Sequence, residues 1–209
     1  RDITERKLME KKQRMQQSIG LAISESESFA EFIQLVCDEL SAFIDMSNFY
    51  VALYDFDQNV FESPVFSDLY DSTDKWPASN SLSEIVIRKN APVLLNFKEI
   101  TELKESGRYN YLGPSPKSWL GIPLRKEGIP FGVFALQNYE IEDAYVDTDL
   151  ELMLFVSNQI GVAVNRKEDE QQIKLLFKSI EQSSVSVVIT DNNGTIEYVN
   201  PKFTDVAGY

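Results

Sequence analysis

The chain has 209 residues, of which 43% are hydrophobic and 25% are charged, a composition typical of a folded globular protein. Its formal net charge of −13 argues against nucleic-acid binding, which needs clustered lysine and arginine to neutralise phosphates. The sequence has no histidine and one cysteine, so it lacks the usual general base, the commonest metal ligand and an internal disulfide. The longest apolar segment is too short and too polar to span a bilayer. We therefore expect a cytoplasmic protein with no metal site, no nucleic-acid partner and no membrane contact.

The N-terminal residues 3–22 are predicted to form a helix. Leu8, Met15 and Ile19 recur along it at coiled-coil spacing. These side chains exceed what one small domain needs for its core, so we expect them to face water in a monomer.

A second helix is predicted over residues 28–44, where apolar residues follow the spacing of one helix face. Ser28 and Glu31 form a capping box at its start. Cys37 falls inside the apolar stripe, which predicts a buried, unreactive thiol rather than a cofactor attachment or redox site.

Period-two patterns predict two paired strands, at residues 48–56 and 60–66. Both faces of the first strand are apolar, so it should be covered on both sides. Residues 67–80 read as a polar, solvated loop. Its acids, spaced by three, could bind calcium, but the loop lacks the glycine and glutamate of a calcium-binding loop; these acids are Asp68, Asp71 and Asp74.

A short helix is predicted to begin at the capping pair Ser81 and Glu84 and to stop at Asn90, ahead of a strand at residues 92–95. Asn96 is then a helix N-cap rather than a ligand contact, and Gly107 ends the helix that follows.

Residues 118–139 are predicted to form a hairpin with a three-residue loop at 126–128. Pro123 inside its first strand indicates a sheet edge or a bulge, because proline cannot donate to a ladder.

A long helix is predicted from Asp147, which we expect to be its N-cap. No proline or glycine stops it, so it continues as a connector whose second part has no core of its own. Its apolar residues keep coiled-coil spacing: Ile173, Leu176, Phe177 and Ile180. Residues 185–199 form a second hairpin, and Asn200 caps a helix opening with Pro201.

These elements predict an α/β (α+β) fold with a central antiparallel sheet of five or six strands. The helices at 28–44 and 149–165 should pack on one face, and loops with short helices on the other. Long connector helices should flank this core.

Residues 28–166 resemble a GAF domain. The segment SWLGIPLRKEGIPFGVFALQNY is similar to the central hairpin of that family, and DTDLELMLFVSNQIGVAVNR is similar to its closing helix. The resemblance implies a sensory or regulatory module rather than an enzyme.

Both ends resemble pieces of PAS domains. EQSSVSVVITDNNGTIEYVNPKFTDVAGY is similar to the opening of a PAS domain, and RDITERKLMEKK to the segment that closes one. We therefore interpret the chain as part of a longer protein in four segments. These are the end of a PAS domain with a connector helix (1–27), the GAF domain (28–166), a second connector helix (167–182) and the start of a truncated PAS domain (183–209).

Several functions known from GAF domains need residues that this sequence lacks. Bilin-binding relatives use a cysteine, usually beside a histidine, and haem-binding relatives use a histidine, so neither cofactor is expected. The cyclic-nucleotide signature is absent, and free methionine sulfoxide reductases need several cysteines. No catalytic residue is assigned, and the identity of any cofactor is left open.

If a small molecule binds, we expect it on the loop-covered face of the sheet. The candidates are polar-tipped aromatics and one amide near strand ends, suited to an apolar site with few polar anchors. They are Tyr54, Trp76, Tyr109, Trp119 and Asn138.

The string of domains is typical of sensor histidine kinases, and we expect a homodimer formed through the connector helices. Two alternatives stay open. One is a GAF core that binds nothing and serves only for dimerisation and relay. The other is the regulatory part of a cyclic-dinucleotide cyclase or phosphodiesterase.

Overall fold

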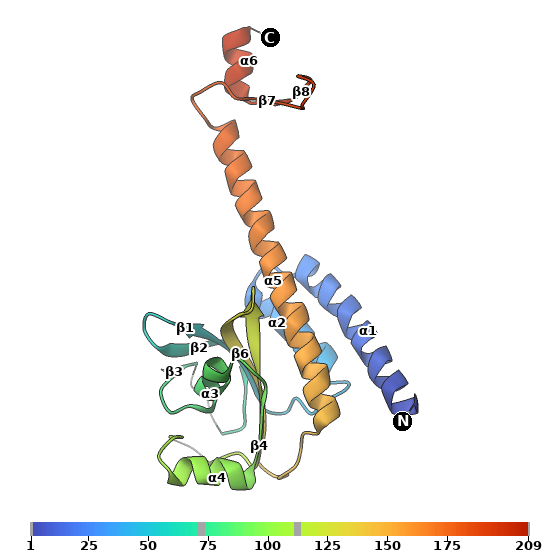
Figure 1. The fold of residues 1–209 in the computed structure, drawn as a ribbon, viewed down its shortest axis with the longest axis vertical. Helices are drawn as coiled ribbons and strands as arrows, with labels where there is room; N and C mark the ends of the chain where they lie inside the picture. Colours follow the sequence, from blue (N-terminus) through green and yellow to red (C-terminus); the bar gives the residue numbers. More distant parts are fainter. Residues whose placement is uncertain (1, 71–73, 111–113, 209) are drawn as a thin grey trace. The chain divides into compact units, whose positions relative to one another are not determined.

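The computed structural model describes residues 2–70, 74–110 and 114–208, which divide into two compact units, Arg1–Val164 and Asn165–Tyr209. Figure 1 draws both units and labels most of their elements. The helix α5 (Asp147–Glu181) contributes its first part to one unit and its second part to the other.

The first unit is built on a six-stranded sheet in which all neighbouring strands are antiparallel, in the order β3-β2-β1-β6-β5-β4. The predicted α+β fold with a central antiparallel sheet is therefore confirmed. In chain order the strands are β1 (Phe49–Asp55), β2 (Val60–Ser67), β3 (Lys75–Pro77), β4 (Val93–Asn96), β5 (Ser118–Lys126) and β6 (Ile129–Asn138).

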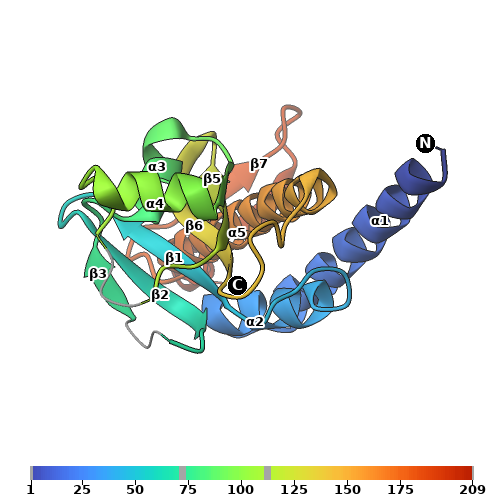
Figure 2. The same cartoon turned by 90° about the horizontal axis from the view of Figure 1, so that it is seen from below.

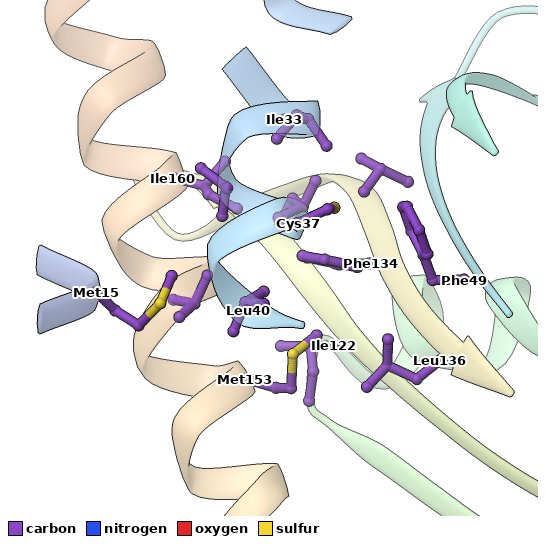
Figure 3. Packing of buried hydrophobic residues seen from close by; sticks show 14 of the residues in the cluster. Met15, Ile33, Cys37, Leu40, Phe49, Ile122, Phe134, Leu136, Met153 and Ile160 are labelled. Carbon is purple, nitrogen blue, oxygen red and sulfur yellow. The ribbon is translucent and has the colours of Figure 1, made fainter. Parts of the chain in front are cut away.

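One face of the sheet is covered by α1 (Asp2–Glu25), α2 (Phe29–Leu40) and the first part of α5. Figure 3 shows the apolar cluster between these helices and the sheet, with Cys37, Phe134 and Met153 among its members. Cys37 is 2% exposed, as the apolar stripe predicted. We name this the helix-covered face.

The prediction that the first helix would leave its apolar residues in water is wrong. Met15 is 0% exposed and Ile19 is 3% exposed, because α1 packs on the same chain and contributes to the cluster of the helix-covered face. Leu8 is half-buried against that cluster. Polar contacts hold α1 from both neighbouring helices: Ser18 Oγ donates to Glu39 of α2 at 3.2 Å, and Lys12 pairs with Glu151 of α5 at 3.6 Å.

The opposite face is covered by α3 (Leu82–Lys89) and α4 (Phe97–Glu105), as Figure 2 shows from below. The predicted N-cap at Asn96 is confirmed, with its side chain and that of Glu99 satisfying each other's backbone amides at 3.0 Å. We name this the site face.

The other two predicted capping boxes are only half formed. The Ser28 and Ser81 hydroxyls accept from the expected amides, but the glutamates reach one residue further back. Glu31 accepts from Glu27 N at 2.7 Å and Glu84 from Asn80 N at 2.8 Å.

Two loops differ from expectation. Residues 75–77, predicted to be part of a polar loop, form the edge strand β3, in which Trp76 pairs with Phe61 of β2. The β5–β6 turn has two residues rather than three, because Lys126 already pairs with Ile129. Glu127 and Gly128 both have positive φ, 50° and 83°, as a twisted two-residue hairpin turn requires.

The prediction for Pro123 is confirmed. The pairing of β4 with β5 stops at Gly121, so Pro123 has a neighbouring strand on one side only, and a bulge follows between Leu124 and Arg125. Asp147 is the first residue of α5 rather than its cap. The carboxylate of Asp149 instead accepts from the amide of Val146 at 3.0 Å.

The second unit contains the last part of α5, the two-stranded pair β7 (Val188–Thr190) and β8 (Ile196–Val199), and α6 (Pro201–Ala207). The predicted hairpin and capped helix are confirmed. Asn200 is 0% exposed and joins these pieces, because its Nδ2 donates to Ile180 O at 3.1 Å and its Oδ1 accepts from Phe203 N at 3.1 Å.

Candidate functional site

The site face of the sheet carries an apolar cluster with polar tips. Alternate residues of the strands point to it, and α3, α4 and the segment after α4 cover it. Its buried members are Tyr50, Ala52, Phe61, Ala78, Leu82, Val86, Val93, Ile100, Tyr109, Trp119, Val133 and Ala135.

Two of the predicted site residues belong to an aromatic array near β2 and β3. Trp76 stacks on Phe61 with 5.7 Å between ring centroids and meets Tyr50 edge-on at 5.4 Å. Tyr54 packs against Phe61 at 5.1 Å, and its hydroxyl donates to Asn59 Oδ1 at 2.8 Å. Both residues are half-buried, so each presents part of its ring at the rim of the site face.

Trp119 and Tyr109 lie deeper. Trp119 is 1% exposed, and its indole covers Gly121, where an added Cβ would fall 2.1 Å from the ring. Glycine at position 121 is therefore what allows the indole to lie flat on the strand. Tyr109 is 5% exposed and closes the same cluster from the segment after α4.

The centre of the site face contains a buried hydrogen bond between two hydroxyls. Tyr50 of β1 and Ser83 of α3 are 8% and 1% exposed, and their oxygens are 2.9 Å apart. This bond ties the cover helix α3 to the sheet through two side chains. On the helix-covered face, the buried Ser157 hydroxyl of α5 donates to a backbone atom of the sheet, Pro123 O of β5.

The sequence reasoning missed a polar group at the end of β6. Gln137 is 5% exposed and sits on the site face, because it alternates with Ala135 and pairs directly with Trp119. Its Nε2 donates to Asp68 Oδ2 and, at 3.0 Å, to the Tyr139 hydroxyl. The Tyr139 hydroxyl itself donates to Asp68 at 3.1 Å, and its ring meets Tyr70 at 4.6 Å.

The fifth predicted site residue, Asn138, is not brought together with the others. It follows Gln137 in the strand and therefore shares the opposite face with Leu136. Its Nδ2 donates to Asp45 at 3.2 Å, and its Oδ1 accepts from the amides of Glu140 and Ile141. These contacts shape the turn after β6. The strand's parity was the signal that could have selected Gln137 instead.

Residues 67–80 are predicted to form a solvated loop, but one of its acids contacts the sheet. Asp68 is engaged by side chains of β6 and by the amide of Tyr70 at 2.8 Å, so it is not the solvated loop residue we expected. Asp71 lies outside the described residues. Among residues 2–70, 74–110 and 114–208, no three His, Cys, Asp or Glu side chains form a group that could hold a metal ion.

Two groups near the helix-covered face, Cys37 and Tyr145, have pKa values raised mainly by burial. Burial, and then the charge of Asp38, raises the pKa of the Cys37 thiol. Burial also raises the pKa of Tyr145, with smaller contributions from the charges of Asp45 and Asp149. Cys37 is thus a protonated thiol on the face away from the site.

Within the described ranges, no helix is both long enough and apolar enough to cross a membrane.

Comparison with known proteins assigns the fold to a family. The GAF domain family matches residues 26–165, which is more than half of the chain. No curated protein sequence matches this chain significantly.

Solved structures share this fold at low sequence identity. A GAF domain of a phosphoenolpyruvate-protein phosphotransferase from Coxiella burnetii has a TM-score of 0.61 and 12% identity, covering 77% of this chain and 96% of that one. Residues 122 to 287 of a methyl-accepting chemotaxis protein give a TM-score of 0.60 and 17% identity, with coverages of 76% and 98%.

An enzyme appears among the similar structures as well. The free methionine-R-sulfoxide reductase from Neisseria meningitidis, solved in complex with its substrate, has a TM-score of 0.62 and 10% identity, covering 76% of this chain and 91% of that one. At such identities the likeness describes the fold alone. From the family match and the shared architecture, this chain belongs to the GAF domain family.

Proposed function

We propose that this chain is the sensory part of a signal-transduction protein, in which the GAF domain senses a small ligand or partner and a dimeric connector helix carries the change onward. The observation that carries this proposal is the single helix α5, 35 residues long. Its first part contributes Leu152, Val156 and Ile160 to the core of the GAF domain. A change in that core therefore acts directly on the start of the connector.

The second part of α5 is the proposed contact with a second copy of the chain. Ile173 and Leu176 are 64% and 58% exposed, and the half-buried Ile180 continues their three- and four-residue spacing. Such a stripe is what two helices bury in a coiled coil. Because Met15 and Ile19 of α1 are already buried in their own chain, the proposed contact is assigned to α5.

Sedimentation velocity of matched variants tests the dimer. Wild type is expected to sediment as a dimer and Leu176→Glu as a monomer, because a charge in the stripe opposes its burial. Leu175→Glu is the control, since Leu175 is 65% exposed but lies on the other side of the helix, and it is expected to remain dimeric. If all three sediment as monomers over a wide concentration range, this route of signalling is ruled out.

The proposed parent is a cytoplasmic sensor histidine kinase with PAS domains on either side of the GAF domain. The support is the resemblance of both ends to PAS segments, together with the hairpin and Asn200-capped helix at residues 188–207. A cyclic-dinucleotide cyclase or phosphodiesterase is the alternative parent. The domains of the parent protein would distinguish them, since a histidine kinase carries a phospho-acceptor helix with an ATP-binding domain and the alternative carries a cyclase or phosphodiesterase domain.

The proposed role of this chain is regulatory and not catalytic. Its one thiol is buried in the helix-covered face, away from the polar groups of the site face. A purely structural GAF core, which binds nothing, is favoured by the close mutual packing of Trp76, Phe61 and Tyr50. A thermal-shift screen distinguishes a ligand-sensing domain from this purely structural core, because a ligand that prefers the native state raises Tm.

A further inference from the structure

The side chain of Gln137 has a fixed orientation. Both hydrogens of its Nε2 are used, one by Asp68 and one by the Tyr139 hydroxyl at 3.0 Å. The reversed amide would place its oxygen against the Asp68 carboxylate, two acceptors in contact, so the observed orientation is the favourable one. Oε1 is thereby turned away from Asp68, and no donor among the described residues reaches it, although the residue is 5% exposed.

Asp68 holds this arrangement and is not itself the open group. Its carboxylate accepts from the amide of Tyr70 at 2.8 Å, from the Tyr139 hydroxyl at 3.1 Å and from Gln137. Asp68 therefore acts as a positioning residue that orients the amide of Gln137.

Asn48 lies directly beside Gln137. Its side-chain amide has the opposite end open, the NH2 group rather than the oxygen. The backbone amide of Gln137 donates to Asn48 O at 2.9 Å. The Oδ1 of Asn48 accepts from the amide of Leu69 at 3.0 Å, so its Nδ2 is the free end, with no acceptor among the described residues. Asn48 is 5% exposed.

Trp119, the cross-strand partner of Gln137, adds a second donor. It is 1% exposed, and within the described part of the chain its indole N–H has no acceptor. None of these three atoms is a fully buried polar atom without a partner, so each still reaches solvent from a side chain that is otherwise buried. One acceptor and two donors on neighbouring positions are therefore open to a ligand, which can replace water there.

The pattern selects the chemistry of that partner. An anionic group would meet the Asp68 carboxylate behind Gln137, and an ammonium would satisfy Gln137 but face the donors of Asn48 and Trp119. A neutral group with N–H beside C=O fits all three. The Tyr70 and Tyr139 rings, 4.6 Å apart at their centroids, favour a planar body next to it.

We infer that the site face recognises a carboxamide or lactam group of its ligand. Gln137 Oε1 accepts from the N–H of that group, and Asn48 Nδ2 and the Trp119 indole N–H donate to its carbonyl. This inference rests on the proposed sensory function and specifies the ligand class for it.

A set of three probes on one ring tests the inference. Nicotinamide carries the carboxamide, nicotinate a carboxylate and 3-(aminomethyl)pyridine an ammonium at the same position. Titration followed by the side-chain amide signals in ¹⁵N NMR spectra is expected to shift Gln137 and Asn48 with nicotinamide and to leave them unmoved with the two charged probes. Equal shifts with nicotinate, or none with nicotinamide at tens of millimolar, overturn the inference.

Matched variants sharpen the test. Gln137→Met keeps the volume and removes the acceptor, and nicotinamide is expected to bind at least tenfold more weakly. Gln34→Met, the same change on the exposed side of α2, is expected to bind as wild type does. If Gln137→Met does not fold, the wild-type shifts alone decide. A different molecule that binds wild type and Gln137→Met equally would remove this inference and leave the proposed sensory function standing.

Discussion

The two faces of the GAF sheet are built from the same strands but differ in what their cores contain. The helix-covered face packs aliphatic and aromatic side chains against three helices, and its thiol is enclosed. The site face packs aromatic rings against short helices and keeps hydroxyl, indole and amide groups among them. An apolar core stabilises without specifying a ligand, whereas open polar groups in a core lower stability and can define what binds.

The largest expected effect is at the closest contact of the helix-covered face. A Cβ at Gly161 would lie 2.2 Å from the carbonyl oxygen of Arg125, so Gly161→Ala must push α5 away from β5. We expect a loss of about 3 kcal/mol in the free energy of unfolding, measured by urea denaturation.

Gly20→Ala is the control for that change. Gly20 lies in α1 with nothing within 4 Å of an added Cβ, so alanine should stabilise by about 0.5–1 kcal/mol. Equal effects of the two substitutions would mean that α5 does not pack closely on β5.

A medium effect is expected at the buried hydroxyl pair of the site face. Tyr50→Phe and Ser83→Ala each remove one partner of the 2.9 Å bond, and each should cost about 1–2 kcal/mol. A double-mutant cycle by chemical denaturation should give a coupling energy of about 1 kcal/mol.

Tyr54→Phe serves as the comparison for this cycle. Its hydroxyl bonds to the exposed Asn59, so its loss should cost less than about 0.5 kcal/mol. A coupling energy near zero between Tyr50 and Ser83 would show that their hydrogen bond does not help to hold α3 on the sheet.

The smallest effect is expected where the turn after β6 meets Asp45. A hydrogen bond from the Ser47 hydroxyl, with further ones from the Ser47 amide and Asn138, lowers the pKa of Asp45, and burial opposes this only in part. Ionised Asp45 therefore stabilises the fold above the unfolded pKa of about 3.9, and the contribution is lost as pH falls through the folded value.

Asp45→Asn should accordingly lower Tm at neutral pH and have less effect at acid pH. Asp45 is mostly exposed, so we expect less than about 1 kcal/mol. Asp57→Asn in the exposed β1–β2 turn is the control. An Asp45→Asn effect of the same size at both ends of the pH range would contradict the assignment.

Local signals were sufficient for most of the fold. The caps at Ser28 and Asn96, the alternation of β1 and the uninterrupted pattern of α5 depend on neighbours in sequence, and each forms where it was predicted. The burial of Met15 does not depend on such neighbours, because it follows from how α1 packs against α2 and α5.

The sequence predicted only some of the residues of the candidate site. Alternation assigns aromatic residues such as Trp119 to a face. Near the end of β6 we predicted Asn138 as a site residue, although alternation with Val133 and Ala135 places Gln137 on the site face. The contact that distinguishes them joins Gln137 to Asp68, 69 residues away in the chain. Likewise, β3 is defined by its pairing with residues 60–62 of β2, and a strand of three residues is too short to show an alternating pattern in the sequence.

Because Cys37 is buried, the rate at which its thiol reacts reports how often the domain opens locally. The chain has one thiol, enclosed between α2 and the sheet and held protonated by its raised pKa. A thiol reagent added in excess can therefore react only when α2 lifts from the sheet. The labelling rate, read with or without a bound ligand, measures how often the helix-covered face exposes its interior, and it does so without any engineered probe.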